Sequence, residues 1–181
     1  MRGELVRKGI HILVGAAFAA APFFISREYI LIICSALVVG ATLIQFWAWL
    51  MKYFLLDRSA VGAIYHFIGI GITAWYFLPE SLYAYLFGVL ALTFADSAAA
   101  LIGRWIGKNR VHIGSNKRTL EGSLTFFAVT ILILYLLPVT LSIGTMIVIA
   151  VLLTHIELFA PHQTDNILIP LVGAALLYFL A

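Results

Sequence analysis

Long apolar runs separated by short polar segments make up most of this 181-residue chain. A helix needs about 20 apolar residues to cross a bilayer, and about seven runs approach that length. The pattern therefore predicts an all-α fold, a polytopic membrane bundle of about seven transmembrane helices. We expect these helices near residues 9–25, 29–50, 60–78, 82–103, 122–138, 140–158 and 167–181.

Composition supports the same class. Hydrophobic residues make up 64% and charged residues 10% of the chain, and the mean hydropathy is +1.08. A soluble domain is nearer half apolar and a quarter charged, so this chain lacks the polar surface that a soluble fold needs. We expect a single integral membrane domain over residues 1–181 and no nucleic acid partner. The lone Cys34 has no second cysteine to pair with, and we expect it to pack in the core.

The basic residues gather on one side of the predicted membrane. With seven helices, the N-terminus shares a side with the loops after the second, fourth and sixth helices. Ten of the eleven Lys and Arg residues fall on that side, and Arg27 alone falls on the other. The positive-inside rule then places the N-terminus in the cytoplasm, for a protein of a prokaryotic plasma membrane or an endomembrane. The ten are Arg2, Arg7, Lys8, Lys52, Arg58, Arg104, Lys108, Arg110, Lys117 and Arg118.

The segment from residue 94 to 127 places an acid inside an apolar run. Charged groups in a membrane are expensive and are usually kept for ions, substrates or partners. On a helix, Asp96, Ala100, Gly103 and Gly107 form one stripe, along which a helix or a phosphate chain can approach closely. A carboxylate beside such a stripe suits Mg²⁺. The alternative is plain helix packing, with Asp96 paired to a basic neighbour such as Arg104.

A basic loop follows that acid. Glycines and small polar residues permit turns and expose backbone N–H groups, while Lys and Arg neutralise phosphate, so the loop suits a polyphosphate. The alternative is a loop that contacts anionic lipid headgroups. We predict that residues 104–121 form a cytoplasmic nucleotide-binding segment. Its basic residues are Arg104, Lys108, Arg110, His112, Lys117 and Arg118.

Three further acids lie at helix ends on the same side. Glu121 opens the fifth helix, Glu157 lies near the end of the sixth, and Asp165 with Asn166 introduces the last. Acids are favoured in a first helical turn, and Asp165 can cap its helix, so structural roles stay open. The acids at 157 and 165 are also candidates to hold a second cation or to accept a hydroxyl proton.

Two histidines lie within predicted helices. His11 follows Arg7 by one turn and is a candidate phosphate contact, whereas interfacial anchoring accounts for Arg7 and Lys8. His66 lies between two glycines of the third helix. We expect it to be a hydrogen-bonded core histidine.

The motifs FADSAAALIGRWIG and NKRTLEGS resemble the polyprenol kinase family, which includes dolichol kinases, phytol kinases and CTP-dependent diacylglycerol kinases. Residues 117–123 match its second motif. Arg7, Lys8 and His11 match an N-terminal R-K-x-x-H, and Glu157 with 165–166 matches a C-terminal acid followed by D-N. The resemblance spans nearly the whole chain, and the superfamily is similar to the CDP-diacylglycerol synthases.

This resemblance implies a kinase that transfers a phosphoryl group from CTP to a membrane isoprenoid alcohol at the cytoplasmic face. Asp96, with Glu121 or Asp165, would hold Mg²⁺, and Glu157 or Asp165 would accept the hydroxyl proton. The predicted nucleotide contacts are Lys117, Arg118, Arg104, Lys108, Arg110, Gly103, Gly107, Asn166 and His11.

Other functions remain as alternatives. A cytidylyltransferase that makes a CDP-lipid from CTP would use similar residues. A small membrane transporter is the alternative outside the enzymes, although transporters commonly show internal repeats, and none is evident here. Whether copies of the chain form a homo-oligomer stays open.

Overall fold

Helices dominate the structure, a computed structural model that describes residues 2–51, 59–113, 116–161 and 163–181. Within that part the chain is an all-α helical membrane protein, as predicted, with one small hairpin added. The fourth predicted helix is a continuous rod in which α4, a π-helical turn η2 and α5 follow one another. The helices are α1 (Arg2–Ala20), η1 (Ala21–Phe23), α2 (Arg27–Met51), α3 (Ser59–Phe77), α4 (Leu82–Leu90), η2 (Ala91–Ala95), α5 (Asp96–Trp105), α6 (Leu120–Leu136), α7 (Ile143–Phe159) and α8 (Asp165–Leu180).

The helices differ in their capacity to span a bilayer. Among the described residues, three segments are long and apolar enough to cross a membrane, namely Leu5–Phe23, Arg27–Trp47 and Leu82–Trp105. Four shorter apolar stretches of 10–17 residues, each within one helix, accompany them. A 17-residue helix is about 25 Å long, slightly less than a hydrocarbon core of about 30 Å. The shorter stretches are Val61–Phe77, Leu120–Leu136, Ile143–Phe159 and Asp165–Leu180.

Two local features depart from the sequence prediction. Helix α1 begins at Arg2 rather than near residue 9, so the N-terminal basic residues lie on a regular helix. The basic loop contains an antiparallel hairpin, β1 (Arg110–Ile113) and β2 (Asn116–Thr119), that we did not predict. Strand alternation then decides which basic side chains face the bundle.

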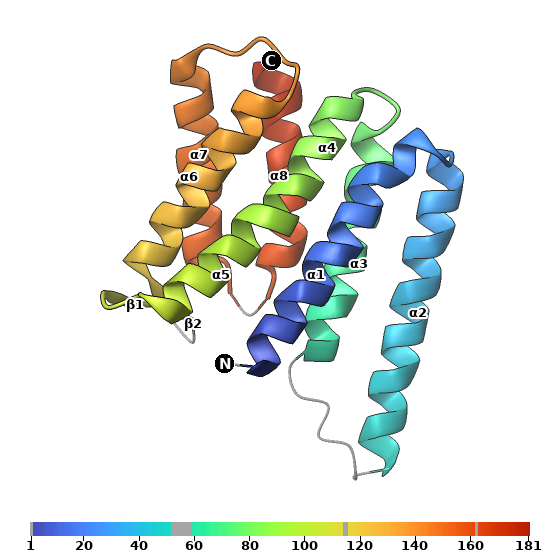
Figure 1. Cartoon of the computed structure of the whole chain (residues 1–181). Coiled ribbons are helices and arrows are strands. Elements are labelled where there is room, and N and C mark those ends of the chain that lie inside the picture. The colour runs from blue at the N-terminus through green and yellow to red at the C-terminus, as the bar shows by residue number, and fades with distance from the viewer. Residues whose placement is uncertain (1, 52–58, 114–115, 162) are drawn as a thin grey trace.

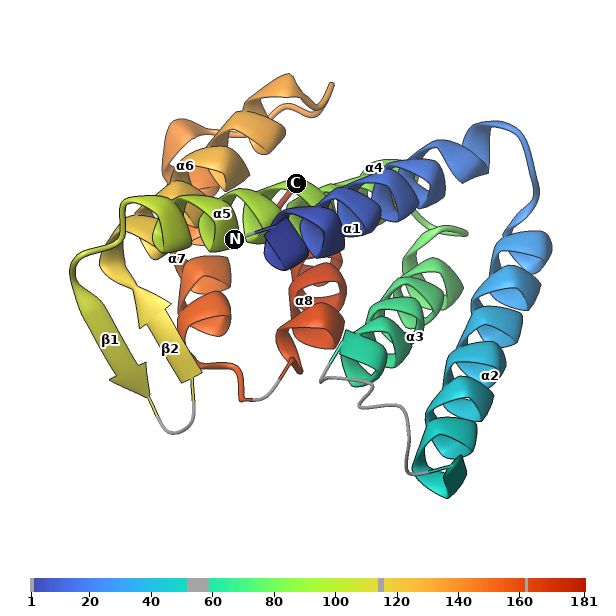
Figure 2. The same cartoon turned by 60° about the horizontal axis from the view of Figure 1, so that its bottom comes forward.

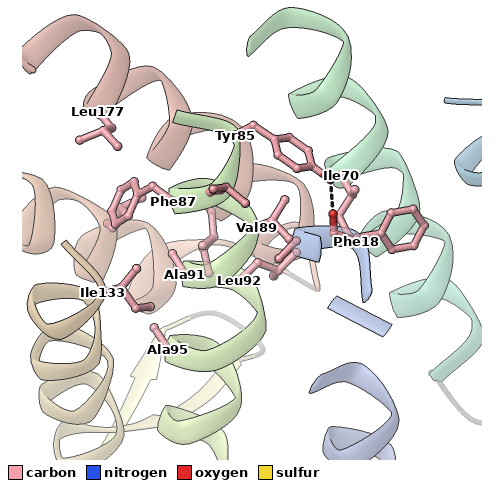
Figure 3. Packing of buried hydrophobic residues seen from close by; sticks show 14 of the residues in the cluster. Phe18, Ile70, Tyr85, Phe87, Val89, Ala91, Leu92, Ala95, Ile133 and Leu177 are labelled. Atoms are coloured by element: carbon pink, nitrogen blue, oxygen red, sulfur yellow. Dashed lines mark hydrogen bonds between the residues drawn. The ribbon is translucent and has the colours of Figure 1, made fainter. Parts of the chain in front are cut away.

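The core is centred on the α4–η2–α5 rod. Tyr85, Phe87 and Leu92 of this rod are fully buried, and the Tyr85 hydroxyl donates to the Phe18 carbonyl oxygen of α1 at 2.9 Å (Figure 3). Helix α2 contrasts with this rod, because only 11% of its apolar segment is buried. In Figure 1 α2 lies at the edge of the bundle beside α3, where most of its surface would face lipid.

Glycines on facing surfaces let α4 and α8 pack closely. A Cβ on Gly88 would overlap the carbonyl oxygen of Pro170, and one on Gly173 would lie 3.4 Å from the Gly88 Cα. The rod is therefore fixed against α8 along its first half. This contact leaves its second half, α5, to pack on α1 and α6.

One end of the bundle gathers the polar elements. Figure 1 shows the N-terminus, the hairpin and the start of α8 at the lower end. Figure 2, which brings this end forward, shows the start of α1 lying against α5 and the hairpin standing beside α7. The segments that carry the predicted site residues therefore meet at this end.

Candidate functional site

A buried ion pair joins α1 to α5. Lys8 Nζ donates to Asp96 Oδ2, and the two side chains are only 4% and 5% exposed. Nε2 of His11, one turn further along α1, lies 4.0 Å from the same carboxylate oxygen. Asp96 opens α5, which ends at Trp105, so it lies about 14 Å inside that helix end. An ion pair at this depth is costly to desolvate and is weak evidence for a purely structural role.

The π-helical turn supplies the partner of His11. In such a turn the regular i to i+4 ladder is interrupted, which frees backbone groups for other bonds. His11 Nε2 donates to the Leu92 carbonyl oxygen of η2 at 3.2 Å. The His11 ring also lies beside His66 of α3, with 4.3 Å between ring centroids. We call Lys8, His11, His66 and Asp96 the inner cluster.

A second network lies nearer the helix ends. Arg118 of β2 donates from Nη1 to Glu157 Oε1 and from Nη2 to Asp165 Oδ2, both at 2.6 Å. The Ser123 hydroxyl donates to the second Glu157 oxygen at 3.0 Å. The Glu157 side chain is 3% exposed and that of Asp165 is 11% exposed. We call Arg118, Ser123, Glu157 and Asp165 the rim cluster.

The hairpin aims Arg118 at these acids. Neighbouring residues of a strand point to opposite faces, so Thr119 faces α5 while Arg118 faces α7 and α8. Burial lowers the pKa of Arg118, but the carboxylates of Glu157 and Asp165 outweigh burial and raise it above its ordinary value. The guanidinium therefore keeps its charge in this setting.

The two clusters interact electrostatically. The charge of Asp96 acts on Arg118, Glu157 and Asp165. Asp96, Glu157 and Asp165 supply three carboxylates, and Lys8 and Arg118 supply two cations. With all five ionised, these groups have a small excess of negative charge that a divalent cation can offset.

The glycine stripe packs helices together. A Cβ on Gly103 would lie 2.5 Å from Thr119 Oγ1 and 3.3 Å from the Gly122 Cα. Gly107 follows the end of α5, and a Cβ there would overlap the Gly103 carbonyl oxygen and lie 2.7 Å from Thr119 Cγ2. Thr119 in turn caps α6, because its Oγ1 accepts from the Gly122 N–H at 3.1 Å. In this structure the stripe brings the hairpin and α6 against α5 rather than leaving a space for phosphate.

Glu121 lies apart from Asp96. Its carboxylate is exposed and accepts from the Lys108 N–H at 3.1 Å and from the Asn109 N–H at 3.2 Å. The Asn109 side-chain amide donates to it as well, at 3.1 Å. These bonds lie beyond the far end of α5 from Asp96, so the structure does not bring the two acids together as a metal site. Glu121 instead fixes the turn that leads into the hairpin.

The other predicted residues fall into three groups. Arg104, Lys108 and Arg110 are exposed at the same end of the bundle. Asn166 lies beside the rim cluster; its N–H donates to Asp165 Oδ1 at 2.9 Å and its amide donates to the Gly62 carbonyl oxygen at 3.3 Å. The side chains of His112 and Lys117 lie outside the described part of the chain.

Sequence reasoning missed two members of these clusters, Lys8 and Ser123, and predicted the bonding of a third, His66, wrongly. Lys8 was expected to anchor at the interface, but it is buried as the partner of Asp96, the role we had considered for Arg104. Its three-residue spacing from His11 puts both on one helix face and was the available signal. Ser123 was noted only as part of the family motif. His66 is buried as expected, but its nitrogens have no hydrogen-bond partner among the described residues, so its expected bonding was wrong.

The described acids do not by themselves form a complete protein site for a magnesium ion. No group of three or more His, Cys, Asp or Glu side chains within the described ranges is arranged to hold a metal. Mg²⁺, however, commonly takes only one or two protein carboxylates and completes its shell with substrate phosphates and water. Of the predicted ligands, Asp165 is influenced by the charge of Asp96. A magnesium ion at these two acids therefore stays a prediction.

Two curated proteins are similar to this chain over most of its length. An uncharacterised protein of Methanocaldococcus jannaschii is 27% identical over 191 residues, covering 94% of this chain and 91% of the relative. A phytol kinase of Synechocystis is 24% identical over 185 residues, covering 96% of this chain and 78% of the relative. No family model matches the chain, and no solved structure matches it. The similarity to the phytol kinase suggests a membrane protein related to the polyprenol and phytol kinases.

Proposed function

We propose that this protein is a lipid-alcohol kinase that transfers the terminal phosphoryl group of CTP to a membrane isoprenoid alcohol of the phytol, polyprenol or dolichol class. The observation that carries the proposal is the buried Lys8–Asp96 pair beside the Arg118 network. Charged groups held at such depth are usually functional. The full-length similarity to a phytol kinase supports the same reaction class.

The two clusters lie at different depths in the bundle and would have different roles. The rim cluster lies where α7 ends and α8 begins. A soluble nucleotide would reach it from the cytosol. Arg118 would exchange a carboxylate for a phosphate oxygen, since its planar fork suits both partners. Lys8 would neutralise charge on the transferred group from the inner side. The exposed Arg104, Lys108 and Arg110 would attract the polyphosphate to this end.

The reaction is an in-line displacement at the γ-phosphorus. The alcohol oxygen forms the new bond, the bond from phosphorus to the β–γ bridging oxygen breaks, and CDP leaves with that electron pair. The hydroxyl proton passes to a neighbouring carboxylate, for which Glu157 and Asp165 are the candidates. When bound by Asp96 and Asp165, Mg²⁺ would neutralise phosphate charge. Positioning and charge neutralisation account for most of the catalysis in such transfers.

The experiment is a transfer assay with purified protein in phospholipid nanodiscs. Mg²⁺ and CTP labelled at the γ-phosphate are supplied with phytol, geranylgeraniol, dolichol or diacylglycerol in separate reactions. We expect label in a lipid monophosphate, with CDP released in equal amount.

Other outcomes would contradict this assignment. Pyrophosphate release together with transfer of an α-phosphate label into lipid would identify cytidylyl transfer. Solute flux in proteoliposomes without nucleotide, in the absence of any labelled lipid, would identify a transporter.

A further inference from the structure

His66 differs from the other histidines whose side chains the structure describes. His11 bonds to the Leu92 carbonyl oxygen at 3.2 Å, and His155 bonds to the Val151 carbonyl oxygen at 2.8 Å. His66 is 4% exposed, and neither Nδ1 nor Nε2 has a hydrogen-bond partner among the described residues. A buried polar group without a partner destabilises the fold, so it calls for a ligand or a functional reason.

The position of His66 is fixed from two sides. Gly62 and Gly69 share its face of α3. A Cβ on Gly69 would overlap the Asn166 carbonyl oxygen, and one on Gly62 would lie 2.7 Å from Gln163 Oε1, so α8 and its leading turn pack closely there. On the other side the His11 ring lies 4.3 Å away. The imidazole is thereby held in the inner cluster with Lys8 and Asp96.

The surroundings of His66 suit a neutral hydroxyl on an apolar chain. Helix α3 begins at Ser59, so His66 lies about 10 Å inside that helix end. Phe67 and Phe18 form a tilted pair nearby, with 6.0 Å between ring centroids, and Ile70 one turn further along α3 is fully buried. A nucleotide phosphate would be drawn instead to the cations Lys8 and Arg118, and the imidazole is left for an uncharged partner.

We propose that His66 is the binding residue for the hydroxyl group of the acceptor lipid before transfer, with one ring nitrogen accepting the O–H while the chain extends along the apolar helices. The hydroxyl then turns its hydrogen from His66 to the carboxylate that accepts the proton during transfer. This inference rests on the proposed function and adds the residue that holds the acceptor. A neutral imidazole carries one acceptor nitrogen, and that nitrogen is unused here.

A binding experiment without nucleotide tests this inference separately from catalysis. Phytol and phytol methyl ether, which lacks the O–H donor, are titrated into the detergent-purified full chain while thermal stability is followed. We expect wild-type protein to bind phytol about tenfold more tightly than the ether, the difference of roughly one hydrogen bond. In His66→Leu the two should bind within about twofold, whereas His155→Leu should keep the tenfold difference, since His155 is exposed on α7.

Activity measurements add a second readout. His66→Leu should raise the KM for phytol and leave the KM for CTP unchanged. His66→Gln, which keeps an acceptor, should recover part of the preference for the alcohol. Equal binding of phytol and its ether by wild-type protein would overturn the inference, as would an undiminished preference in His66→Leu. If the preference holds but no alcohol is phosphorylated, the hydroxyl site stands and the kinase proposal fails.

Discussion

The inner cluster and the rim cluster differ in how completely their polar groups are paired. In the rim cluster Arg118 is bonded to two carboxylates, and Ser123 occupies a second oxygen of Glu157. In the inner cluster Lys8 and Asp96 pair, but the nitrogens of His66 are left without partners in the described structure. A paired network persists without a ligand, whereas an unpaired buried group is better satisfied when one binds.

The clusters also differ in origin. The inner cluster comes from α1, α3 and α5, and the rim cluster from the hairpin, α6, α7 and α8. The two halves of the bundle thus each contribute charged groups to one end of the molecule. Under the proposed function, the inner cluster is the half-site for the lipid and the rim cluster is the half-site for the nucleotide. The charge of Asp96 acts on Arg118 of the rim cluster and so couples the two half-sites. The predictions below separate their contributions.

The largest effect is expected from Asp96→Asn. The substitution keeps the side-chain size but removes the charge that faces Lys8 and acts on Arg118. Phosphoryl transfer to phytol should fall about 10³-fold, as it does when a central electrostatic group is lost. A helical spectrum and elution volume equal to those of wild type would show that the fold persists. Transfer within tenfold of wild type would remove Asp96 from the mechanism.

Arg118→Met tests the rim cluster. It leaves Glu157 and Asp165 buried without their cation, so the free energy of unfolding should fall by about 3 kcal/mol. Transfer should fall about 100-fold. Relative to wild type, the KM for CTP should rise more than the KM for phytol. Arg110→Met is the matched control, because Arg110 is an exposed arginine of the same hairpin. If both variants lost transfer activity equally, the reaction would depend only on the overall charge of the hairpin and not on the position of Arg118.

Gly103→Ala tests the packing that positions the hairpin. The new methyl group would lie 2.5 Å from Thr119 Oγ1, which is already engaged as the cap of α6. We expect stability to fall by about 2 kcal/mol, as in overpacked cores, and transfer to fall by about tenfold. In Gly40→Ala nothing lies within 4 Å of the new atom, and the helix should gain about 1 kcal/mol. If Gly103→Ala behaves like Gly40→Ala, the close approach of α5 and α6 is not required.

Glu121→Gln should have the smallest effect. The exposed carboxylate bonds backbone N–H groups of the preceding turn, and an amide oxygen can replace one of these bonds. Transfer should change by less than about threefold, as is typical of surface substitutions. A loss near that of Asp96→Asn would return Glu121 to the catalytic set and contradict its structural assignment.

The sequence predicted the helices well because membrane insertion imposes long apolar runs that are visible in one dimension. The predicted 60–78 is observed as Ser59–Phe77, and the predicted 82–103 as Leu82–Trp105. The hairpin was missed because its strands are short, although Val111 and Ile113 alternate with polar residues next to Gly114 and Ser115.

The pairing within the site was harder to predict. Asp96 was singled out correctly as a buried acid, since a charge in an apolar run is conspicuous. Its partner Lys8 lies 88 positions away in sequence, and local spacing favoured Arg104 instead. The bonding of Arg118 to Glu157 and Asp165 depends on the same kind of long-range contact. Such pairs follow from the packing of helices, which a single sequence does not specify.

The central claim is that the Lys8–Asp96 pair serves the reaction rather than the fold. The double variant Lys8→Met with Asp96→Leu replaces the pair with apolar side chains, a change that is often neutral or stabilising for buried ion pairs. We predict a melting temperature equal to or above that of wild type, and phosphoryl transfer to phytol reduced about 10³-fold or more. A double variant that transfers phosphate at a wild-type rate would contradict the account.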